Sequence, residues 1–405
     1  MKIVQINSYC GYGSTGRIVV DISKKLNENN YENYIFYGVG KSSYENSIKF
    51  GGTFNLRGHQ IKTRLLGKHG FYSKNVTNKM IEKLKKINPD IVHLHNLHGH
   101  YLNVEILFNY LKAYNKKVIW TLHDCWSFTG HCAHFEYIGC DKWKTECNNC
   151  PQLNEYPRSW IFDRSKESYI DKKKLFTGLN NLIFITPSTW LKDKLSQSFL
   201  GDYKAITINN GIDLNIFKPI SSIDIRKKYK LEDKYVILAV ASVWSSQKGL
   251  NDLIKLSEMI DNNKVIMVVG VSKEQKRILT ENMIGIERTE NIEELANIYS
   301  TADVFVNTTY QDTFPTVNIE ALACGTPVIT YNSGGSPEII DENTGVVVEK
   351  SDLLALHKAI SNMKRKDNYQ DYCISKASFF YNKENSYSKY IDIYQDIILN
   401  VGKGN

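Results

Sequence analysis

The sequence contains no run of roughly 18 apolar residues, the length with which an α-helix crosses a membrane. It also contains no internal repeats and no low-complexity tract. The opening residues, MKIVQINSY, read directly as a β-strand and not as the basic and apolar regions of a signal peptide. We therefore expect a cytoplasmic protein without a signal peptide or a transmembrane helix.

The length of the chain predicts two domains. At 405 residues it exceeds what one hydrophobic core usually organises. Hydrophobic residues make up 42% of the chain and charged residues 23%, as in an ordinary globular protein.

The net charge of +8 is unevenly distributed, with +12 in residues 1–200 and −4 in the remainder. In the first half, basic residues interleave with apolar and aromatic ones in His59–Lys74, Asn78–Ile87 and Arg158–Phe176. This pattern predicts contact with an anionic membrane surface, although ordinary solvated helix faces have the same composition. Nucleic acid is not the expected partner, because the sequence holds no recognisable nucleic-acid-binding module.

Buried strands alternate with helical stretches throughout the chain, which predicts an α/β fold with parallel, doubly wound sheets. The expected strands of the first half are Lys2–Ile6, Asn33–Tyr37, Asp90–His95, Lys117–Leu122 and Leu182–Thr186. After a turn-rich stretch at Ile208–Pro219, the pattern restarts with Tyr235–Val243, Lys264–Gly270, Gly285–Glu287, Asp303–Thr308 and Pro327–Tyr331.

The stretch Ala302–Ile340 predicts a βαβ unit, in which ligands bind outside the carboxyl ends of the strands. Asp312 lies in its first loop and Glu320 in the following helix. A carboxylate can accept two hydrogen bonds from the vicinal diol of a ribose or a hexose. The second loop holds Gly334 and Gly335, which lack the Cβ atom that would keep a ligand away from the backbone.

A helix start is predicted directly after these glycines. Ser336 is placed to cap the helix, Pro337 occupies its first position, and Glu338 follows. The free N–H groups of a helix N-terminus attract a pyrophosphate. The two loops together therefore predict a sugar-nucleotide site.

The spacing Asp312-x7-Glu320, followed by ALACGTPV and GGSPE, resembles the signature of glycosyltransferase family four. The resemblance extends with gaps over most of the chain and is strongest to bacterial exopolysaccharide and colanic-acid-type transferases. It implies a retaining enzyme of the GT-B fold, with two Rossmann-like domains facing across a cleft. The implied domains are residues 1–207 and 208–380, and residues 381–405 would form a helix that returns to the first domain.

The resemblance also implies residue roles in donor binding. Glu320 would hold the nucleotide ribose, and Asp312 would hold the donor hexose with the backbone of Thr313, Phe314 and Pro315. Asp312 departs from the family, in which the first acid is usually Glu. Lys248 matches the lysine that clamps the donor pyrophosphate in a pattern like GR-x4-KG.

The arginine of that same pattern is replaced by Val243. Lys248 and the N–H groups of a helix N-terminus would then have to neutralise more of the diphosphate charge, or Arg17 or Arg288 would have to help.

Gly11-x-Gly13-x-x-Gly16 matches the dinucleotide-binding pattern G-x-G-x-x-G. A nicotinamide site also needs an acid near the end of the next strand, and no acid lies between Glu32 and Glu45. The absence of this acid weakens the hypothesis that the protein is a nicotinamide-dependent oxidoreductase. The resemblance instead implies that Gly13, Gly16 and Arg17 lie near the donor phosphates.

His123 and Asp124 end a predicted strand of the first half, and His123 matches the active-site histidine of the family. The resemblance implies front-face attack, in which the departing phosphate accepts the proton of the acceptor. Asp124 would then position the acceptor and would not act as a covalent nucleophile.

Five of the eight cysteines fall within residues 125–150. The spacing Cys132-x7-Cys140-x6-Cys147-x2-Cys150 allows a structural zinc site with four thiolate ligands. An iron–sulfur cluster and unligated cysteines are the alternatives. We expect no catalytic cofactor.

Taken together, these features predict transfer of a hexose from a UDP or GDP sugar, with retention at the anomeric carbon. The expected acceptor is a polyprenyl-diphosphate-linked glycan at the inner face of the cell membrane, in synthesis of exopolysaccharide, lipopolysaccharide or capsule. A GT-B-type sugar-nucleotide epimerase and a catalytically silent sugar-nucleotide-binding scaffold are the alternative functions.

Overall fold

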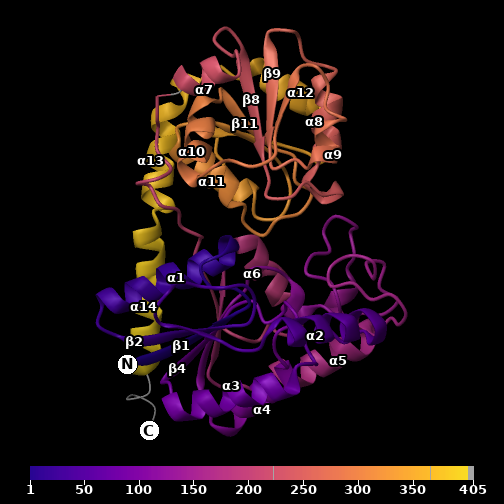
Figure 1. Cartoon of the computed structure of the whole chain (residues 1–405), viewed down its shortest axis with the longest axis vertical. Helices are drawn as coiled ribbons and strands as arrows, with labels where there is room; N and C mark the ends of the chain where they lie inside the picture. Colours follow the sequence, from indigo (N-terminus) through magenta and orange to yellow (C-terminus); the bar gives the residue numbers. More distant parts are fainter. Residues whose placement is uncertain (222, 365, 400–405) are drawn as a thin grey trace. The chain divides into compact units, whose positions relative to one another are not determined.

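A computed structural model describes residues 1–221, 223–364 and 366–399 of the chain. The chain divides into two compact units, each built on its own parallel sheet (Figure 1). The first unit holds Met1–Ile208 and the described residues from Tyr387 onward, and the second holds Asn209–Ser386. The predicted α/β architecture with two Rossmann-like sheets is confirmed.

The first unit contains a seven-stranded sheet in the order β3-β2-β1-β4-β5-β6-β7. All five predicted strands are present, and the structure adds two short strands at the two edges. The strands are β1 (Lys2–Asn7), β2 (Glu32–Tyr37), β3 (Ser47–Lys49), β4 (Ile91–Leu94), β5 (Lys117–Thr121), β6 (Leu182–Thr186) and β7 (Ala205–Thr207). Successive strands are added on one side of β1 up to β3 and on its other side from β4 onward. In such a fold, ligands bind at the carboxyl ends of the two strands where this order switches, here β1 and β4.

Helices flank this first sheet, with apolar side chains packed between the two layers. They are α1 (Gly13–Glu28), α2 (Thr53–Leu66), α3 (Lys74–Ile87), α4 (Val104–Ala113), α5 (Ser165–Phe176) and α6 (Thr189–Ser196). The connection from β5 to α5 runs from Leu122 to Arg164 and holds only the single-turn helices η1 (Trp126–Phe128) and η2 (Lys142–Lys144).

The second unit contains a six-stranded sheet in the order β10-β9-β8-β11-β12-β13. Its strands are β8 (Tyr235–Val240), β9 (Lys264–Val269), β10 (Met283–Ile286), β11 (Val304–Asn307), β12 (Val328–Tyr331) and β13 (Gly345–Val348). Strand β10 begins two residues before its predicted start and ends one residue before its predicted end, and β13 was not predicted. In this sheet the order in which strands are added switches sides between β8 and β11.

The helices of the second unit also pack against its sheet, over a core of buried aliphatic and aromatic residues. They are α7 (Ile223–Lys228), α8 (Leu250–Ser257), α9 (Lys273–Lys276), α10 (Ile292–Thr301), α11 (Thr316–Ala323), α12 (Leu353–Asn362) and α13 (Gln370–Phe380).

The last helix, α14 (Lys383–Leu399), packs on the first unit, as predicted. Tyr387, Tyr390 and Tyr394 are buried in one cluster with Ile3 and Ile91. Residues 400–405 of the predicted terminal segment lie outside the described residues. Among the described helices, none combines the length and the apolar character needed to span a membrane.

Candidate functional site

In the second unit, the loops that follow β8 and β11 are held together by Lys248 and Asp312. The Lys248 Nζ atom lies 2.7 Å from Asp312 Oδ2, and both side chains are half-buried. The backbone N–H of Tyr310 donates to the carbonyl oxygen of Gln247 at 2.9 Å. Gly249 has a φ of +77°, and a Cβ atom there would lie 2.3 Å from the carbonyl oxygen of Thr308. The structure therefore brings the predicted pyrophosphate and hexose residues into direct contact.

The glycine loop after β12 packs against the same segment. The N–H of Gly335 donates to the carbonyl oxygen of Asp312 at 3.1 Å. A Cβ atom on Gly334, whose φ is +53°, would lie 1.7 Å from that oxygen. Glycine is therefore required here because the loop packs directly against the backbone of Asp312. This packing holds the Asp312 loop in place.

The residues between Asp312 and α11 are buried. Thr313, Phe314 and Pro315 follow the acid directly, and the N–H of Phe314 donates to Asp312 Oδ1 at 3.3 Å. This contact directs the carboxylate back over the predicted hexose-binding backbone.

The predicted helix cap at Ser336 is wrong. Pro337–Ile339 form a single 3-10 turn, and Ser336 makes no side-chain capping hydrogen bond. The N–H of Ser336 already donates to the carbonyl oxygen of Ser333 at 3.0 Å, and its φ and ψ are helical. A capping residue needs an extended backbone, so Ser336 is inside the turn and not in front of it. Its buried Oγ atom has no hydrogen-bond partner among the described residues.

Glu320 projects from α11, the helix that follows the Asp312 loop. Its Oε2 atom accepts a hydrogen bond of 2.9 Å from the hydroxyl of Tyr299, which is fully buried on α10. Burial, reinforced by the Glu320 carboxylate, raises the pKa of Tyr299 far above its usual value, so the phenol stays a donor. Tyr299 thereby orients the carboxylate that is predicted to hold the ribose.

Replacing Glu320 by glutamine should weaken donor binding, because an amide offers a diol half the acceptor capacity of a carboxylate. Losing a hydrogen bond to a charged group costs about 1.5–3 kcal/mol, which corresponds to roughly a 10- to 150-fold rise in the Kd of the donor. Isothermal titration with the donor checks this. Tyr299→Phe keeps the carboxylate and should give a smaller rise; unchanged affinity in Glu320→Gln would refute the ribose assignment.

The two candidate arginines are both exposed. Arg288 follows the edge strand β10 in the second unit, and Arg17 lies at the start of the second turn of α1 in the first unit. Gly13 has a φ of +68°, and the N–H of Gly11 donates to the carbonyl oxygen of Gly16 at 2.8 Å. The glycine loop therefore forms a tight turn before α1.

In the first unit, Asp124 is held by a histidine that the sequence analysis did not single out. Its Oδ2 atom lies 2.6 Å from His98 Nε2, and its Oδ1 atom accepts the N–H of Trp126 at 2.9 Å. Burial alone would raise the pKa of Asp124, but the neighbouring His98 outweighs it and holds that pKa below its usual value. The other nitrogen of His98 lies 3.0 Å from the hydroxyl of Tyr156.

His123, which is partly buried, belongs to a column of three histidines whose other members, His93 on β4 and His95 directly after it, are fully buried. Its Nε2 atom lies 3.1 Å from His95 Nδ1, and the two rings are stacked. His95 in turn contacts the amide of Gln5 at 3.1 Å, and His93 contacts the hydroxyl of Tyr394 on α14 at 2.7 Å. Burial lowers the pKa of His123 to about 4, so the imidazole is neutral at physiological pH.

A second histidine cluster lies beside this column. His59, His69 and His100 each offer a nitrogen, and these atoms lie within 4.8 Å of one another. His69 is also in ring contact with His98, at 6.2 Å between centroids. The three histidines come from α2, from the connection after α2 and from the connection after β4, so no local sequence pattern predicts this cluster.

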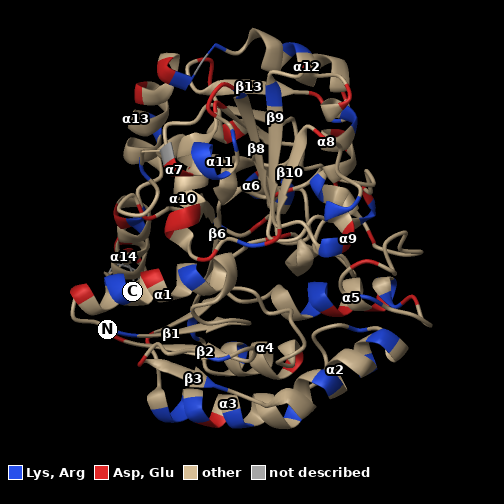
Figure 2. Cartoon of the chain, turned by 45° about the horizontal axis from the view of Figure 1, so that its top comes forward, with Lys and Arg blue, Asp and Glu red and all other residues tan. Residues whose placement is uncertain are grey.

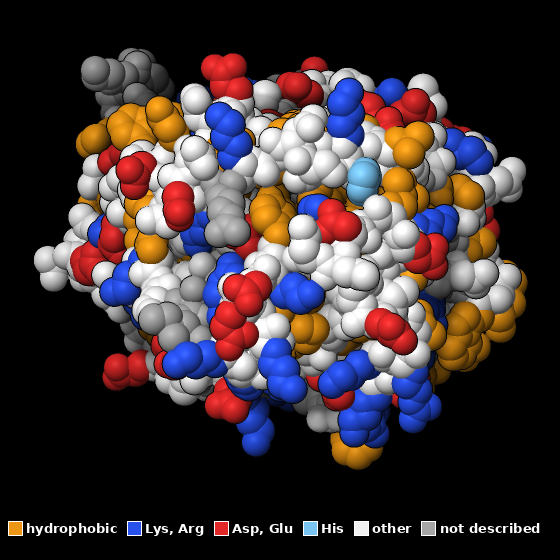
Figure 3. All heavy atoms as spheres, turned by 90° about the horizontal axis from the view of Figure 1, so that it is seen from above, with side chains coloured by type: hydrophobic (Ala, Val, Ile, Leu, Met, Phe, Trp, Pro, Cys, Tyr) orange, Lys and Arg blue, Asp and Glu red, His pale blue; other side chains and the backbone are white. Residues whose placement is uncertain are grey.

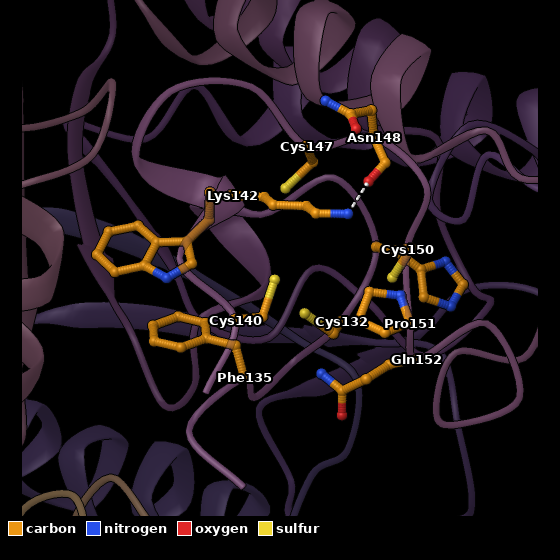
Figure 4. A pocket seen from close by; sticks show the side chains of 11 residues that line it. Cys132, Phe135, Cys140, Lys142, Cys147, Asn148, Cys150, Pro151 and Gln152 are labelled. Carbon is orange, nitrogen blue, oxygen red and sulfur yellow. Dashed lines mark hydrogen bonds between the residues drawn. The ribbon is translucent and has the colours of Figure 1, made fainter. Parts of the chain in front are cut away.

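The four predicted metal-binding cysteines, Cys132, Cys140, Cys147 and Cys150, line one small pocket in the segment between β5 and α5 (Figure 4).

Basic and apolar side chains share the surface of the first unit. Lys and Arg are spread along α2 and α3 (Figure 2). Helix α2 also exposes Phe54, Ile61, Leu65 and Leu66, with Phe54 93% accessible. Trp160 lies beside this helix, because its N–H donates to the carbonyl oxygen of Arg64 and its ring packs under that guanidinium. On the face drawn in Figure 3, by contrast, acidic and basic side chains are interspersed.

The two Rossmann-like units give the chain the GT-B fold. Solved structures with this fold include sucrose-phosphate synthase from Thermosynechococcus elongatus (TM-score 0.73, 18% identity, covering 98% of this chain and 99% of that chain). Another is Anabaena Alr3699/HepE in complex with UDP-glucose (TM-score 0.68, 14% identity, covering 98% of this chain and 100% of that chain).

Two glycosyltransferase family models match consecutive parts of the sequence. The model for Glycosyltransferase Family 4 matches residues 15–216, and the model for Glycosyl transferases group 1 matches residues 221–378. The chain belongs to these glycosyltransferase families. It is 25% identical over 374 residues to the putative colanic acid biosynthesis glycosyl transferase WcaC of Escherichia coli K12, covering 88% of this chain and 89% of that protein.

Proposed function

We propose that the protein transfers a hexose, with retention, from a UDP or GDP sugar to a polyprenyl-diphosphate-linked glycan in the synthesis of a bacterial surface polysaccharide. The observation that carries the donor assignment is the Lys248–Asp312 pair at the carboxyl ends of β8 and β11, followed along the chain by Glu320 on α11. The likeness to WcaC supports the polysaccharide product, and the UDP-glucose bound by HepE supports the donor class.

In the proposed reaction, Lys248 stabilises the charge that develops on the departing diphosphate. The acceptor oxygen forms a bond to the anomeric carbon on the face from which the diphosphate leaves. The bond from that carbon to the phosphate oxygen breaks, and the acceptor proton passes to the departing phosphate. Gly13, Gly16 and Arg17 of the first unit and Arg288 of the second are proposed to contribute to diphosphate binding.

Asp124 and His123 are proposed to position the acceptor. The carboxylate of Asp124 already accepts hydrogen bonds from His98 and Trp126, so it is better suited to fixing a neighbouring group than to forming a covalent bond. His123 is partly buried and neutral, and a neutral imidazole can donate or accept a hydrogen bond at a sugar hydroxyl.

A binding panel tests the donor assignment. A selective ligand raises the melting temperature of the folded protein, so UDP-, GDP-, ADP- and dTDP-sugars should separate in a thermal-shift measurement, with a UDP or GDP sugar giving the largest rise. Adding a lipid-linked acceptor should then release the nucleotide and yield a longer glycan. Isomerised nucleotide sugar without acceptor would identify an epimerase, and binding without any turnover would identify a scaffold.

The membrane part of the proposal rests on the surface of α2 and Trp160. Apolar side chains there can enter the headgroup region while Arg57, Lys62 and Arg64 meet anionic lipids. Binding to vesicles that contain acidic lipid should therefore be strong at low salt and fall steeply as salt increases. Phe54→Ser with Ile61→Ser should reduce it, whereas Phe379→Ser, at a phenylalanine of the second unit that is 75% exposed, should not. Equal binding to neutral vesicles would contradict the electrostatic contribution.

A further inference from the structure

The segment from Leu122 to Arg164 is long, irregular and packed into the protein. Apart from two single-turn helices it has no regular secondary structure, yet Trp126, Phe128, Phe135 and Trp143 are almost completely buried within it. Structureless connections of this length are uncommon in compact domains and need something to fix them. Small irregular cores are commonly stabilised by disulfides or by a bound metal. The cysteines of this segment are free thiols, so a disulfide does not provide the fixation here.

Four of these thiols converge. Cys132, Cys140, Cys147 and Cys150 line the same small pocket, between the stacked rings of Phe135 and Trp143 on one side and Pro151 with Gln152 on the other. Figure 4 shows their sulfur atoms directed into this pocket. They come from four positions along an irregular chain, so the packing of the segment, and not a regular element, brings them together.

Hydrogen-bond donors and cations surround the thiols. The N–H of Gly130 donates to Cys147 Sγ at 3.2 Å. Lys142 Nζ donates to the carbonyl oxygens of Asn148 and Asn149, the two residues between Cys147 and Cys150, at 3.0 and 2.9 Å. Four thiolates around a divalent ion carry a net charge of −2. A cation on the turn between two of the thiols and an N–H directed at sulfur both stabilise that charge.

The second cation of this segment's surroundings is a buried lysine. Lys172 on α5 is fully buried and donates to the carbonyl oxygens of Trp126 and Thr129 at 2.7 and 3.0 Å. Burial lowers its pKa to about 7, and the neighbouring Cys147 and Cys132 act in the opposite direction, toward the charged form. The Lys172 ammonium also lies 3.5 Å from the centroid of the Trp126 ring. Its printed hydrogen bonds go to neutral carbonyl oxygens, so an anionic metal–thiolate centre nearby would supply a counter-charge for this buried cation.

We propose that Cys132, Cys140, Cys147 and Cys150 bind one zinc ion that fixes this segment. All-sulfur coordination favours zinc over magnesium or manganese, and a closed set of four ligands leaves no position for a reacting water. The role is therefore structural. By bracing residues 122–164, the ion would hold the connection that carries His123, Asp124 and Tyr156.

The thiols must move slightly closer together to ligate the ion. Among the described residues, the group whose donor atoms already lie within 4.8 Å of one another is His59, His69 and His100, and it contains no cysteine. A cysteine carries a proton as the free thiol and ligates zinc as the thiolate. Zinc binding would release these protons and contract the pocket.

A histidine at the same pocket is an alternative ligand for one of the four positions. His131 lines it, and its buried Nε2 atom has no partner in the part of the chain that the structure describes.

Elemental analysis of the full chain, purified without chelators, tests the proposal. We expect about one zinc per chain. Cys147→Ser and Cys150→Ser should each lower the zinc content at least fivefold and lower the melting temperature. Cys125→Ser makes the same change at a buried thiol of the same segment that does not line the pocket, and it should keep the zinc. His69→Gln should also keep it, and zinc that is lost from His69→Gln but retained in Cys147→Ser would overturn the proposal.

A measurement on the unmodified chain guards against variants that do not fold. Replacing the bound ion by cobalt should give the intense near-ultraviolet charge-transfer bands of thiolate ligation, and chelation should expose the four pocket thiols to a thiol reagent. A metal-free protein whose pocket thiols react at once would overturn the proposal. Iron with visible absorption would equally overturn it, in favour of an iron–sulfur cluster. Zinc retained in Cys150→Ser but lost in His131→Gln would reject the four-cysteine ligand set.

Discussion

Replacing Lys248 by methionine should lower the rate of sugar transfer by roughly 100- to 1,000-fold, the usual cost of removing one group that stabilises charge in a transition state. Lys248 is the half-buried cation after β8, and the arginine of the family pattern is Val243, which is exposed. One lysine therefore carries a larger share of the charge on the leaving diphosphate. The variant also leaves Asp312 without its partner at 2.7 Å. Nucleotide released from the donor in the presence of acceptor measures the effect.

Two further variants make this result interpretable. Lys255→Met removes an exposed cation from the last turn of the neighbouring α8, and it should leave the rate unchanged. Lys248→Arg keeps the charge and should recover part of the activity. If Lys248→Met retains more than half of the rate while Lys255→Met is normal, the diphosphate is neutralised by other residues, and Arg17 and Arg288 become the candidates.

Acidification should destabilise the first unit well above the pH at which carboxylates titrate. In the unfolded chain His93, His95 and His123 take up protons near pH 6.5. In the folded protein burial lowers the pKa of His123 to about 4 and places those of His93 and His95 well below their usual value. The unfolded state thus binds more protons, and stability is full above about pH 6.5 and falls below it. By pH 5 each imidazole removes about 2 kcal/mol from the free energy of unfolding.

Denaturant unfolding at pH 7, 6 and 5 measures this slope. Groups packed against the column are the hydroxyls of Tyr390 and Tyr394, the amide of Gln5 and the carboxylate of Asp124, whose own pKa is lowered and whose contribution fades only at lower pH. His93→Gln removes one titrating group and should reduce the slope between pH 6.5 and 5. A stability that stays constant over this range in the unmodified protein would show that these imidazoles gain protons in the folded state.

The central strands of both sheets could be predicted from the sequence because each is a short, continuous apolar run. The three strands that were missed, β3, β7 and β13, are all edge strands. Ser47–Lys49 and Ala205–Thr207 have three residues each, and Gly345–Val348 buries only its first and last residues. A strand that pairs on one side needs little hydrophobicity, so its sequence carries little signal.

The candidate site residues could be predicted from the sequence motif, but the residues that hydrogen-bond to them could not. The contact of Tyr299 with Glu320 joins α10 to α11, and the contact of His98 with Asp124 joins the ends of two strands. Such pairs depend on the register of the sheet and on helix packing, which local sequence does not encode. The error at Ser336 has the opposite origin, because a local capping pattern was overruled by a turn that begins earlier, at Ser333.

Helix α14 determines when the first unit can finish folding on the ribosome. All seven strands of its sheet have been synthesised by Thr207, yet Ile3 and Ile91 stay uncovered, and His93 lacks its hydroxyl partner, until Tyr394 has left the exit tunnel. The second unit has its complete sheet and helices by Ser386 and can fold first. We expect that a chain terminated before Tyr387 keeps the second unit folded and loses the first, although the missing residues are those furthest from it along the chain.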